Sequence, residues 1–533
     1  MIVAPQPVAV EEGAKVLMRG GNAIDAAVTC AFIQAIVDPQ MCGIGGYGLA
    51  TVMLAGNPNL ITYDAQALAG EKTSGAMWVD KIIGLSPDGW GYFLKDFAND
   101  AGYASICTPG WVRLMSHLLA THGSITWAEA IAPAIEIATS GFVVNDKLAR
   151  DWRKPAPYPQ ALGLADYVRR NPEASRIYLR PNGEMPDVGD VVRNPDYANT
   201  LQKLVARGAE DFYTGELASV MARDLAAHGA YVTQADLAQY KLVARAPDAI
   251  SYRDNIVNTA TAPHGGTTVL AILKILEGWD LRAMGHNSAE YIYKVAMAMK
   301  AAFFDRNKYM ADPGFVAVPT AWMIGNKRAA EWRKHIDTGM PIEAMPVPTG
   351  QPNTTQVTIV DKLGNCIALT HSLGNSSGVI TPGLGFIYNN SMINFDPLPG
   401  GANSIAPGKG RTTGMAPTIV TKGGKPVLVL GAPGASRIIT SILQVIVNVL
   451  DFGMSASDAV LAPRFDCQIN MIRCQRRIPS YVLDEVRTRH PAVHLPYSHG
   501  EMGRVHAICI DPSSATLSGG AEVGGDGMAL EVS

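Results

Sequence analysis

Asn353-Thr354-Thr355-Gln356-Val357-Thr358-Ile359-Val360-Asp361 opens the part of the chain in which strands are expected to dominate. The segment predicts a strand. It follows residues 340–353, MPIEAMPVPTGQPN, which carry four prolines and no helical or strand period, so an exposed connector is expected there. Alone, two threonines at the start of a strand say little, because threonine favours strands in general. Their meaning depends on the rest of the chain.

The residues after this segment predict a sheet. A turn is expected at Gly364-Asn365, and a single helix is expected within the sequence SRIITSILQVIVNVLDFG. Further strands are predicted at CIALTHS, GVITPGLGFIYNN, APTIVTKGGKPVLVLG (with Gly-Gly-Lys-Pro as its turn), VHAICID and TLSGGA.

The residues before it predict mainly helices. Two are expected between Val8 and Pro39, the second starting at an Asn22 N-cap and buried because apolar residues surround it. GIGGYGLATVML and NLITYDAQAL predict a hairpin of two strands. From Pro109 to about Arg333 the pattern is mostly helical. The expected organisation is a helix-rich first two thirds and a sheet-rich last third around shared layers.

Composition excludes several classes of protein. The chain has 533 residues, a formal net charge of -3 and no block of like charges, so disorder and a nucleic-acid or anionic-membrane partner are not expected. Its seven cysteines form no CxxC pair, which predicts buried thiols rather than a disulfide or zinc framework. The sequence shows no signal peptide and no membrane-length apolar run. A cytoplasmic protein is expected, although a removed signal or pro-segment would leave no trace.

Three local motifs have ordinary structural interpretations. Gly43 to Gly48 fits GxGxxG, but a helix precedes it and a strand follows, so a close-packed glycine turn is expected instead of a nucleotide site. Gly374 to Gly378 fits GxSxG without the following helix of a nucleophile elbow, which predicts a polar turn. The histidines lack metal-ligand spacing, so no metal site is predicted, and His264 and His371 are expected to be hydrogen-bonded core or rim residues.

Taken together, the chain resembles the gamma-glutamyltranspeptidase family along essentially its whole length, because many short matches occur in the family's order. In the first two thirds they are GGNAIDAAV (20–28), GIGGYG (43–48), TPG (108–110), SGFVVND (140–146), GAEDFYTGELA (208–218), PHGGTT (263–268) and DRNKYMADP (305–313). In the last third they are TTQVTIVDKLGN (354–365), NNSMINF (389–395), GMAPTIV (414–420), GAPGASRIITSILQVIVNVLDFG (431–453) and APRF (462–465).

The resemblance implies an α/β protein with the four-layer αββα sandwich of N-terminal-nucleophile hydrolases, made as a precursor that cleaves itself before a threonine. The matching residue is Thr354. Cleavage between Asn353 and Thr354 implies a helix-rich large subunit, residues 1–353, and a sheet-rich small subunit, residues 354–533. Together the subunits would form one αββα domain and a heterodimer, which could dimerise further. The implied partner is a small-molecule amide, and no cofactor is implied.

The implied chemistry is physically reasonable. A threonine hydroxyl is a weak nucleophile unless a base lies beside it, and the free α-amine that cleavage creates supplies one near neutral pH. By resemblance, Thr354 attacks an amide carbonyl to give an acyl-enzyme, and water or an amine releases the acyl group. The second hydroxyl that bonds the nucleophile matches Ser372. The oxyanion-binding backbone N–H groups match Gly434 and Ala435.

The resemblance fails at the residues that hold a gamma-glutamyl head group. The family's arginine for the α-carboxylate has no counterpart in residues 72–78, KTSGAMW, and its serine pair is Thr413-Gly414 here. The acidic position that holds the α-amine is Asn394, and the amide or acid three residues before it is Ser391. A neutral asparagine cannot form the charge-assisted bond that selects an ammonium. Gamma-glutamyl transfer is therefore disfavoured, and hydrolysis of an amide with another acyl group is expected.

Three cationic residues remain near these positions. Lys409 and Arg411, in PGKGR, are each expected either to hold an anionic amide substrate, as in the oxamate amidohydrolases of this family, or to cap their loop. Arg437 belongs to the family pattern and is expected to be structural.

These observations lead to one preferred hypothesis and two alternatives. We expect a self-processing threonine amidohydrolase with altered acyl specificity. One alternative is a genuine gamma-glutamyl hydrolase or transpeptidase whose anchors lie elsewhere in the chain. The other is a degenerate family member that binds a ligand without catalysis, against which the retained Thr354, Ser372 and oxyanion turn argue.

Overall fold

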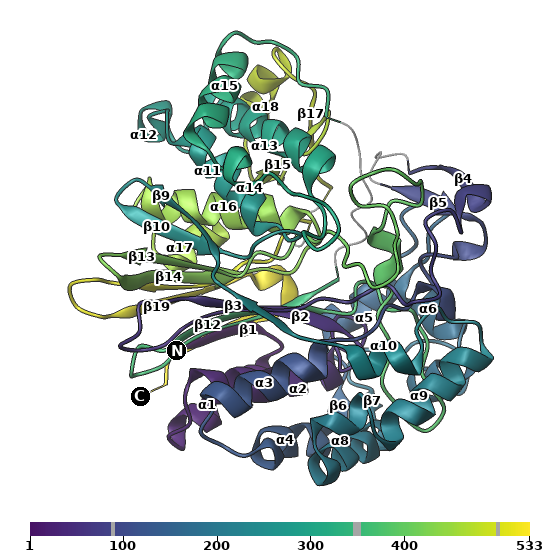
Figure 1. Cartoon of the computed structure of the whole chain (residues 1–533). Helices are drawn as coiled ribbons and strands as arrows, with labels where there is room; N and C mark the ends of the chain where they lie inside the picture. Colours follow the sequence, from purple (N-terminus) through teal and green to yellow (C-terminus); the bar gives the residue numbers. More distant parts are fainter. Residues whose placement is uncertain (87–90, 345–352, 497–500, 533) are drawn as a thin grey trace.

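The computed structural model describes residues 1–86, 91–344, 353–496 and 501–532. Two antiparallel sheets are stacked face to face, and helices cover the outer face of each, giving four layers (Figure 1). The expected αββα architecture is therefore confirmed. Most of the expected proline-rich connector, residues 345–352, lies outside the described residues.

The first sheet has the strand order β20-β1-β11-β12-β2-β3-β8, and the second has the order β19-β18-β14-β13-β10-β9. The first consists of β1 (Ile2–Pro5), β2 (Tyr47–Met53), β3 (Ile61–Ala65), β8 (Val243–Arg245), β11 (Thr355–Val360), β12 (Cys366–Ser372) and β20 (Gly527–Leu530). The second consists of β9 (Asp248–Tyr252), β10 (Asn255–Thr259), β13 (Thr418–Lys422), β14 (Lys425–Gly431), β18 (His506–Ile510) and β19 (Leu517–Ala521).

Helices from the first half of the chain pack on the first sheet, and later helices pack on the second. The first group is α1 (Pro7–Met18), α2 (Ala23–Val37), α3 (Trp111–His122), α4 (Trp127–Ser140), α5 (Asp146–Arg153), α6 (Leu164–Arg169), α7 (Pro172–Tyr178), α8 (Pro195–Arg207), α9 (Glu216–Ala227) and α10 (Gln234–Gln239). The second group is α11 (Gly266–Leu276), α12 (Leu281–Met284), α13 (Ala289–Tyr309), α14 (Thr320–Met323), α15 (Asn326–Asp337), α16 (Arg437–Leu450), α17 (Ala456–Leu461) and α18 (Ser480–Arg487).

Small two- and three-stranded sheets lie outside these layers. They are formed by β4 (Ile82–Leu85) with β5 (Tyr92–Leu94), by β6 (Phe142–Val143) with β7 (Val191–Val192), and by β15 (Phe465–Asp466), β16 (Ile472–Cys474) and β17 (Ala492–His494). No helix in the described part of the chain is long and apolar enough to cross a membrane.

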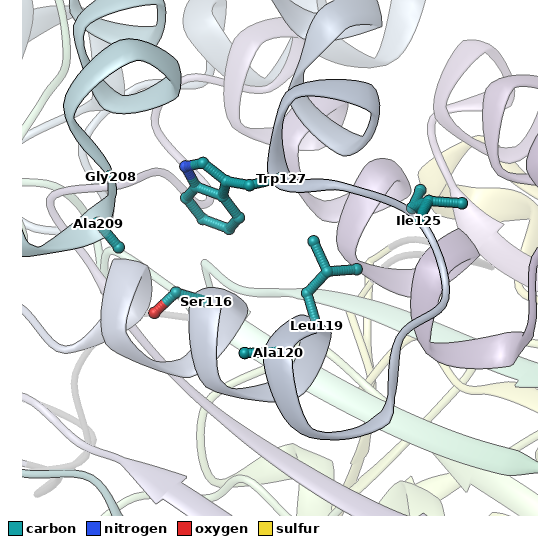
Figure 2. A pocket seen from close by; sticks show the side chains of 7 residues that line it. All are labelled: Ser116, Leu119, Ala120, Ile125, Trp127, Gly208 and Ala209. Atoms are coloured by element: carbon teal, nitrogen blue, oxygen red, sulfur yellow. The ribbon is translucent and has the colours of Figure 1, made fainter.

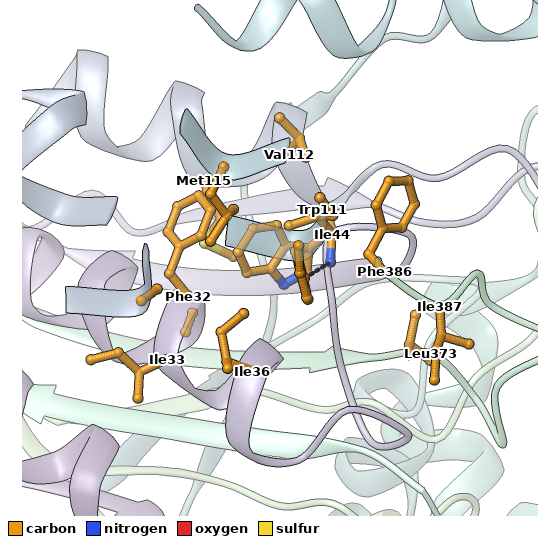
Figure 3. Packing of buried hydrophobic residues seen from close by; sticks show 14 of the residues in the cluster. Phe32, Ile33, Ile36, Ile44, Trp111, Val112, Met115, Leu373, Phe386 and Ile387 are labelled. Carbon is orange, nitrogen blue, oxygen red and sulfur yellow. Dashed lines mark hydrogen bonds between the residues drawn. The ribbon is translucent and has the colours of Figure 1, made fainter. Parts of the chain in front are cut away.

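The largest core lies between the first sheet and its helices. Every residue of α2 is buried, and Asn22 caps the helix by accepting hydrogen bonds from the backbone N–H groups of Ile24 and Asp25, as expected. Phe32 of α2 packs edge-on against Trp111 of α3, with ring centroids 4.8 Å apart (Figure 3). Leu373, directly after β12, belongs to the same core. This packing fixes the position at which β12 ends.

Alternate residues of β11 face opposite layers. Val357 and Ile359 join the helix-side core, whereas the Thr358 hydroxyl donates to the carbonyl of His506 in the second sheet. The Gln356 side chain also points toward the second sheet, because a Cβ placed on Gly431 of that sheet would lie 2.3 Å from Oε1 of Gln356. Because side chains alternate along a strand, Thr354 belongs to the face between the two sheets.

Several sequence predictions about elements are confirmed. The strands at 355–360 and 366–372, the hairpin β2–β3, the helix at 437–450 and the strand pair β18–β19 all occur. The turn between β13 and β14 uses Gly423 and Gly424 at positive φ, a conformation that favours glycine.

Other predictions about elements are wrong. The segment GVITPGLGFIYNN is not a strand, because Gly378, Gly383 and Gly385 have positive φ and turn the chain repeatedly. The stretch from Pro109 to Arg333 is mostly helical, as expected, although it also contributes the strands β6 to β10, which were not predicted. The first residues form β1, and the last third contains α17 and α18 besides the expected helix.

Candidate active site

Thr354 and Ser372 meet at the start of β11 and the end of β12. Their hydroxyl oxygens lie 3.1 Å apart, and both lie close to the carbonyl oxygen of Asn353, at 2.5 Å for Thr354 and 2.7 Å for Ser372. The Ser372 oxygen also accepts the N–H of Gly374 at 2.8 Å. All of these groups are buried or partly buried. The peptide expected to be cut thus has its carbonyl oxygen beside two hydroxyl groups.

The glycine run at 43–48 supports this corner by close backbone contact. A Cβ on Gly46 would lie 2.3 Å from the carbonyl oxygen of Ser372, and one on Gly45 would lie 2.4 Å from that of Ile387. The predicted close-packed turn is therefore confirmed. Tyr47, directly after Gly46, is the cross-strand partner of Ser372 in the β2–β12 pair.

The Asn389-Asn390 pair connects β12 to neighbouring loops. Asn390 donates its backbone N–H to the carbonyl of Leu373 at 3.0 Å and its side-chain amide to Oδ1 of Asp100 at 3.0 Å. The Tyr167 hydroxyl donates to the same oxygen at 2.7 Å. Burial raises the pKa of Asp100 to about 6, although these two hydrogen bonds oppose the shift. The 374–378 segment is the expected polar turn, with Ser376 at φ 69 and no helix following.

Gly434 and Ala435 form a turn with both residues at positive φ, 139 and 51. Within the described part of the chain, neither backbone N–H has a hydrogen-bond acceptor. Successive free N–H groups in such a turn can bind an anion. Gly414 packs directly against this turn, because a Cβ on Gly414 would lie 1.9 Å from the carbonyl oxygen of Ala435.

His371 lies behind Ser372, on the helix side of β12. Its Nδ1 accepts the indole N–H of Trp111 at 3.0 Å, and its Nε2 lies 2.9 Å from Oε1 of Gln34. Burial lowers the pKa of His371 to about 3, so the imidazole is neutral and donates from Nε2. His371 is therefore the hydrogen-bonded core histidine that was predicted.

The three cationic candidates have different surroundings. Lys409 donates to the carbonyls of Ala402 at 2.7 Å and Ser404 at 2.9 Å, which corresponds to the loop-capping alternative. Arg437 donates to the Glu501 carbonyl at 2.7 Å and lies 3.6 Å from the carboxylate of the same residue.

Arg411 differs from both. It is 1% exposed, its guanidinium lies 4.2 Å from the centroid of the Tyr47 ring, and it donates to the Ser391 hydroxyl at 3.2 Å. Within the described residues it has no carboxylate partner, and its Nε has no hydrogen-bond partner. Tyr47 is the cross-strand partner of Ser372, so one residue contacts this cation and is paired with Ser372.

The positions that match the family's amine-binding residues lie on the 3-10 turn η5 (Ser391–Asn394). Asn394 is half-buried, and its backbone carbonyl accepts the side-chain amide of Asn403 at 2.6 Å. The same Asn403 accepts the backbone N–H of Thr412 at 3.1 Å. The structure thus ties η5 to the loop that carries Arg411 and Thr413.

His264 is the feature whose surroundings the sequence did not predict. Its Nδ1 lies 2.9 Å from Oγ1 of Thr413, and its Nε2 lies 3.0 Å from Oδ2 of Asp64. These three residues are far apart in the chain, so no local motif could have revealed the contact. The sequence showed only a Pro/Gly turn at residues 263–266, which says nothing about the partners of His264.

A cavity of about 320 Å³ lies elsewhere, on the helical layer outside the first sheet (Figure 2). It is lined by Ser116, Leu119, Ala120, Ile125, Trp127, Gly208 and Ala209, and no titratable side chain faces it. The first sheet separates it from Thr354. Among the described residues, no group of three or more His, Cys, Asp or Glu side chains is placed to hold a metal ion.

Comparison with known proteins agrees with this geometry. Residues 9–532 match the family model described as gamma-glutamyltranspeptidase. The chain belongs to the gamma-glutamyltranspeptidase family. It is 35% identical to an acylase ACY 1 proenzyme of Pseudomonas sp. (strain V22), with 100% of this chain and 93% of the relative covered.

Other family members support the same assignment. A glutathione hydrolase proenzyme of Escherichia coli (strain K12) is 32% identical, with 88% of this chain and 81% of the relative covered. The crystal structure of a cephalosporin acylase from Bacillus halodurans superposes with a TM-score of 0.87 at 27% identity, covering 99% of this chain and 94% of the other. As a member of this family of self-processing proenzymes, the protein is an autoprocessing amidohydrolase.

Proposed function

We propose that the protein cleaves itself between Asn353 and Thr354 and then uses Thr354 to hydrolyse an amide whose acyl group is not a standard gamma-glutamyl group. The observation that carries this proposal is the meeting of the Thr354 and Ser372 hydroxyls at the Asn353 carbonyl. Two large pieces, residues 1–353 and 354–533, would remain associated as a heterodimer.

In self-cleavage, the Thr354 hydroxyl attacks the Asn353 carbonyl carbon. The peptide C–N bond breaks, an ester forms, and the nitrogen becomes the amine of Thr354. Ser372 stabilises the charge on the carbonyl oxygen, because its hydroxyl lies 2.7 Å away. Water then hydrolyses the ester and releases the Asn353 carboxylate together with the Thr354 hydroxyl.

In the mature enzyme, the same hydroxyl attacks the substrate amide and its proton passes to the Thr354 α-amine. The N–H groups of Gly434 and Ala435 bind the oxyanion, and the leaving amine takes the proton. Water then attacks the acyl-enzyme and restores the free threonine. In this proposal the Ser372 hydroxyl holds the Thr354 hydroxyl in place during formation and hydrolysis of the acyl-enzyme.

The acyl pocket lies around η5 and the 409–414 loop. Asn394 and Ser391 offer no carboxylate to a substrate amine, and Gly414 offers no hydroxyl to a substrate carboxylate. In this proposal Arg411 binds an anionic group of the acyl chain, because its buried guanidinium has no acidic partner among the described residues. Thr413 belongs to the same loop, and Lys409 stabilises the conformation of this loop.

The test is the intact mass and N-terminal sequence of the wild type, Thr354→Ala and Thr355→Ala. We expect the wild type and Thr355→Ala to give pieces of 353 and 180 residues, the second starting Thr-Thr-Gln-Val in the wild type. Thr354→Ala should stay whole. Thr355→Ala is the matched control, since its hydroxyl points to Gln6 on the opposite face of β11. A folded wild type that remains uncut would contradict the proposal.

The acyl specificity is tested on the cleaved enzyme with a panel of p-nitroanilides. We expect gamma-L-glutamyl-p-nitroanilide to be a poor substrate compared with acyl groups that lack the amine. Efficient turnover of the gamma-L-glutamyl compound would favour the glutathione-hydrolase alternative.

A further inference from the structure

A row of buried hydrogen bonds lies on the helix side of β12, behind Ser372. Its first member is His371, the residue before Ser372, and it continues through Gln34 of α2, Gln6 and Asp38. Nε2 of His371 lies 2.9 Å from Oε1 of Gln34, and Nε2 of Gln34 lies 2.9 Å from Oε1 of Gln6. Nε2 of Gln6 then donates to Oδ2 of Asp38. All four side chains are buried, so the row crosses the core from β12 to the end of α2.

The direction of these hydrogen bonds follows from groups that can only donate or only accept. The Gln34 amide nitrogen lies 3.3 Å from the carbonyl oxygens of Pro5 and of Gln356, which only accept. Oε1 of Gln34 therefore faces His371, and Nε2 of His371 must donate to it. On the other side of the ring, Nδ1 faces the indole N–H of Trp111, which only donates. Both sides give the same His371 tautomer.

A buried ion pair forms the far end of the row. Nζ of Lys147, on α5, lies 2.5 Å from Oδ2 of Asp38, and the two side chains are 4% and 2% exposed. The ammonium of Lys147 and the amide nitrogen of Gln6 only donate, so both hydrogen bonds end on this carboxylate oxygen. The side chains of His371, Gln34, Gln6, Asp38 and Lys147 together are the Asp38 network.

A second connection between Asp38 and β12 runs through the backbone. The Asp38 carbonyl accepts the N–H of Met41 at 3.0 Å, and the Met41 carbonyl accepts the N–H of Leu373 at 3.0 Å. Leu373 follows Ser372 in the sequence, as His371 precedes it. Both neighbours of Ser372 are therefore connected to Asp38, one through side chains and the other through the backbone.

Stability alone does not explain this arrangement. Removing an ion pair from water costs free energy, and apolar side chains of similar volume often give equal or greater stability. In a row of hydrogen bonds with defined donors and acceptors, however, the displacement of one member leaves the next without its partner. Such a row therefore holds the residues at its ends in one arrangement.

We infer that Asp38 and Lys147, acting through the Asp38 network, are positioning residues that hold Ser372 in place for catalysis. This inference rests on the proposed function, in which the Ser372 hydroxyl holds the Thr354 hydroxyl during turnover. It gives an ion pair in the helical layer of the first sheet an effect on the rate of acyl transfer. The effect is the same for every acyl group, because the proposed acyl contact is made elsewhere, at Arg411.

Two variants break the network at different points. Gln34→Met leaves Nε2 of His371 without its acceptor, and Lys147→Met leaves the Asp38 carboxylate without its cation. Each should lower kcat by about 10- to 100-fold with KM nearly unchanged, because the nucleophile is displaced and the acyl pocket is not. The loss should be equal for p-nitroanilides that end in a carboxylate and in a carboxamide, in contrast to Arg411→Met.

The kcat values are taken per folded, cleaved molecule, so a variant that is only less stable shows no loss. Lys274→Met is the matched control, because Lys274 is also buried and pairs with Glu277 at 2.7 Å on α11, in the other helical layer. It should lower thermal stability and leave kcat unchanged. Gln34→Met leaves no charge unpaired, so it tests the inference by itself where Lys147→Met does not fold.

The double variant Gln34→Met with Lys147→Met distinguishes one network from two local effects. If the network acts as a unit, the double variant loses no more activity than the more damaged single variant, whereas independent effects multiply. Multiplied losses would overturn the inference. Unchanged kcat in both single variants, or an equal loss in Lys274→Met, would overturn it as well.

The ¹⁵N spectrum of His371 separates failure of this inference from failure of the proposed function. A protein that is never cut, or that hydrolyses no amide after the cut, refutes the proposed function, but the His371 tautomer can still be measured. We expect a proton on Nε2, with a resonance that moves in Lys147→Met at the other end of the network and not in Lys274→Met. A proton on Nδ1, or the same Nε2 resonance in Lys147→Met and the wild type, would overturn the inference.

Discussion

The corner that holds Thr354 and the loop that faces it are built in different ways. At the corner, close backbone packing is prominent: Gly46 lets the chain before β2 lie against the end of β12, and among the described residues the N–H groups of Gly434 and Ala435 have no acceptor. At the loop, side chains decide, as when Arg411 stacks on Tyr47 and His264 bonds Thr413. Under the proposed function, the chemistry depends on two hydroxyl groups that backbone packing positions, whereas acyl recognition depends on side chains that can be exchanged within one loop.

The strongest test of the corner is Ser372→Ala. This change removes the donor at the Asn353 carbonyl and the neighbour of the Thr354 hydroxyl, so we expect self-cleavage to slow by about 10²- to 10³-fold. The time course is followed by gel electrophoresis and mass spectrometry of freshly folded protein. Ser377→Ala is the control, because its buried hydroxyl bonds the Tyr388 carbonyl instead. Equal rates in both variants would show that Ser372 has no part in the cut.

Gly414→Ser tests whether the loop can be returned to the family pattern by one substitution. A Cβ there meets the Ala435 carbonyl, so the oxyanion turn must shift. We expect kcat to fall by about tenfold or more and the free energy of unfolding by about 1–3 kcal/mol, with no gain in gamma-L-glutamyl hydrolysis. At Gly75, a Cβ meets only the Ile405 carbonyl at 3.4 Å, so Gly75→Ser should be tolerated. A gain in gamma-L-glutamyl activity in Gly414→Ser would refute this account.

Arg411→Met removes one charge from the loop and keeps an apolar side chain against Tyr47. We expect KM for an acyl p-nitroanilide that ends in a carboxylate to rise by about 10- to 100-fold, with little change for the matching carboxamide. Lys409→Met should lower thermal stability without changing the ratio between these two substrates, because Lys409 bonds backbone carbonyls. An unchanged ratio in Arg411→Met would show that Arg411 does not bind the carboxylate of the acyl group.

Asp100→Asn is expected to change stability more than activity. The folded-state pKa of Asp100, about 6, lies above the unfolded value near 3.9, so the folded state binds the extra proton between these pH values. The free energy of unfolding should therefore fall as the pH rises from about 4 to 6. Asp100→Asn, which keeps an acceptor for Tyr167 and Asn390, should flatten this profile and stabilise the protein by roughly 2 kcal/mol at pH 7.

The measurement for this last variant is urea unfolding at several pH values. Asp146→Asn serves as the control, because the Asp146 side chain is 78% exposed and pairs with Arg150 on the surface. Parallel pH profiles for the wild type and Asp100→Asn would show that Asp100 is not the group that titrates.

Sequence reasoning could predict features that depend on local pattern or on ordered matches to the family. The capped helix α2, the strand pair β11–β12 and the glycine turn at 43–48 are of this kind. Strands with weak patterns were missed: β1 has only four residues, and β8 to β10 lie within a helical region. The segment 378–390 has strand-like composition, but its glycines adopt positive φ, which composition alone does not reveal.

At the site, the pairing of Thr354 with Ser372 was expected from the family, but the roles of the charged residues were not. Lys409 and Arg411 are two positions apart in a loop, and only their three-dimensional neighbours distinguish a lysine that bonds backbone carbonyls from a buried guanidinium that stacks on Tyr47 and bonds Ser391. The Asp64–His264–Thr413 chain joins residues separated by about 150 to 200 positions, so no spacing rule could predict it.

The strand order has a consequence for the life of the processed enzyme. β1 lies between β11 and β20, and β10 pairs with β13, so both sheets interleave strands from before and after Thr354. Before the cut, folding is a unimolecular process. After it, a denatured molecule must find its other half in solution, so recovery would depend on protein concentration. Under the proposed cleavage, only the uncut precursor could refold from a single chain.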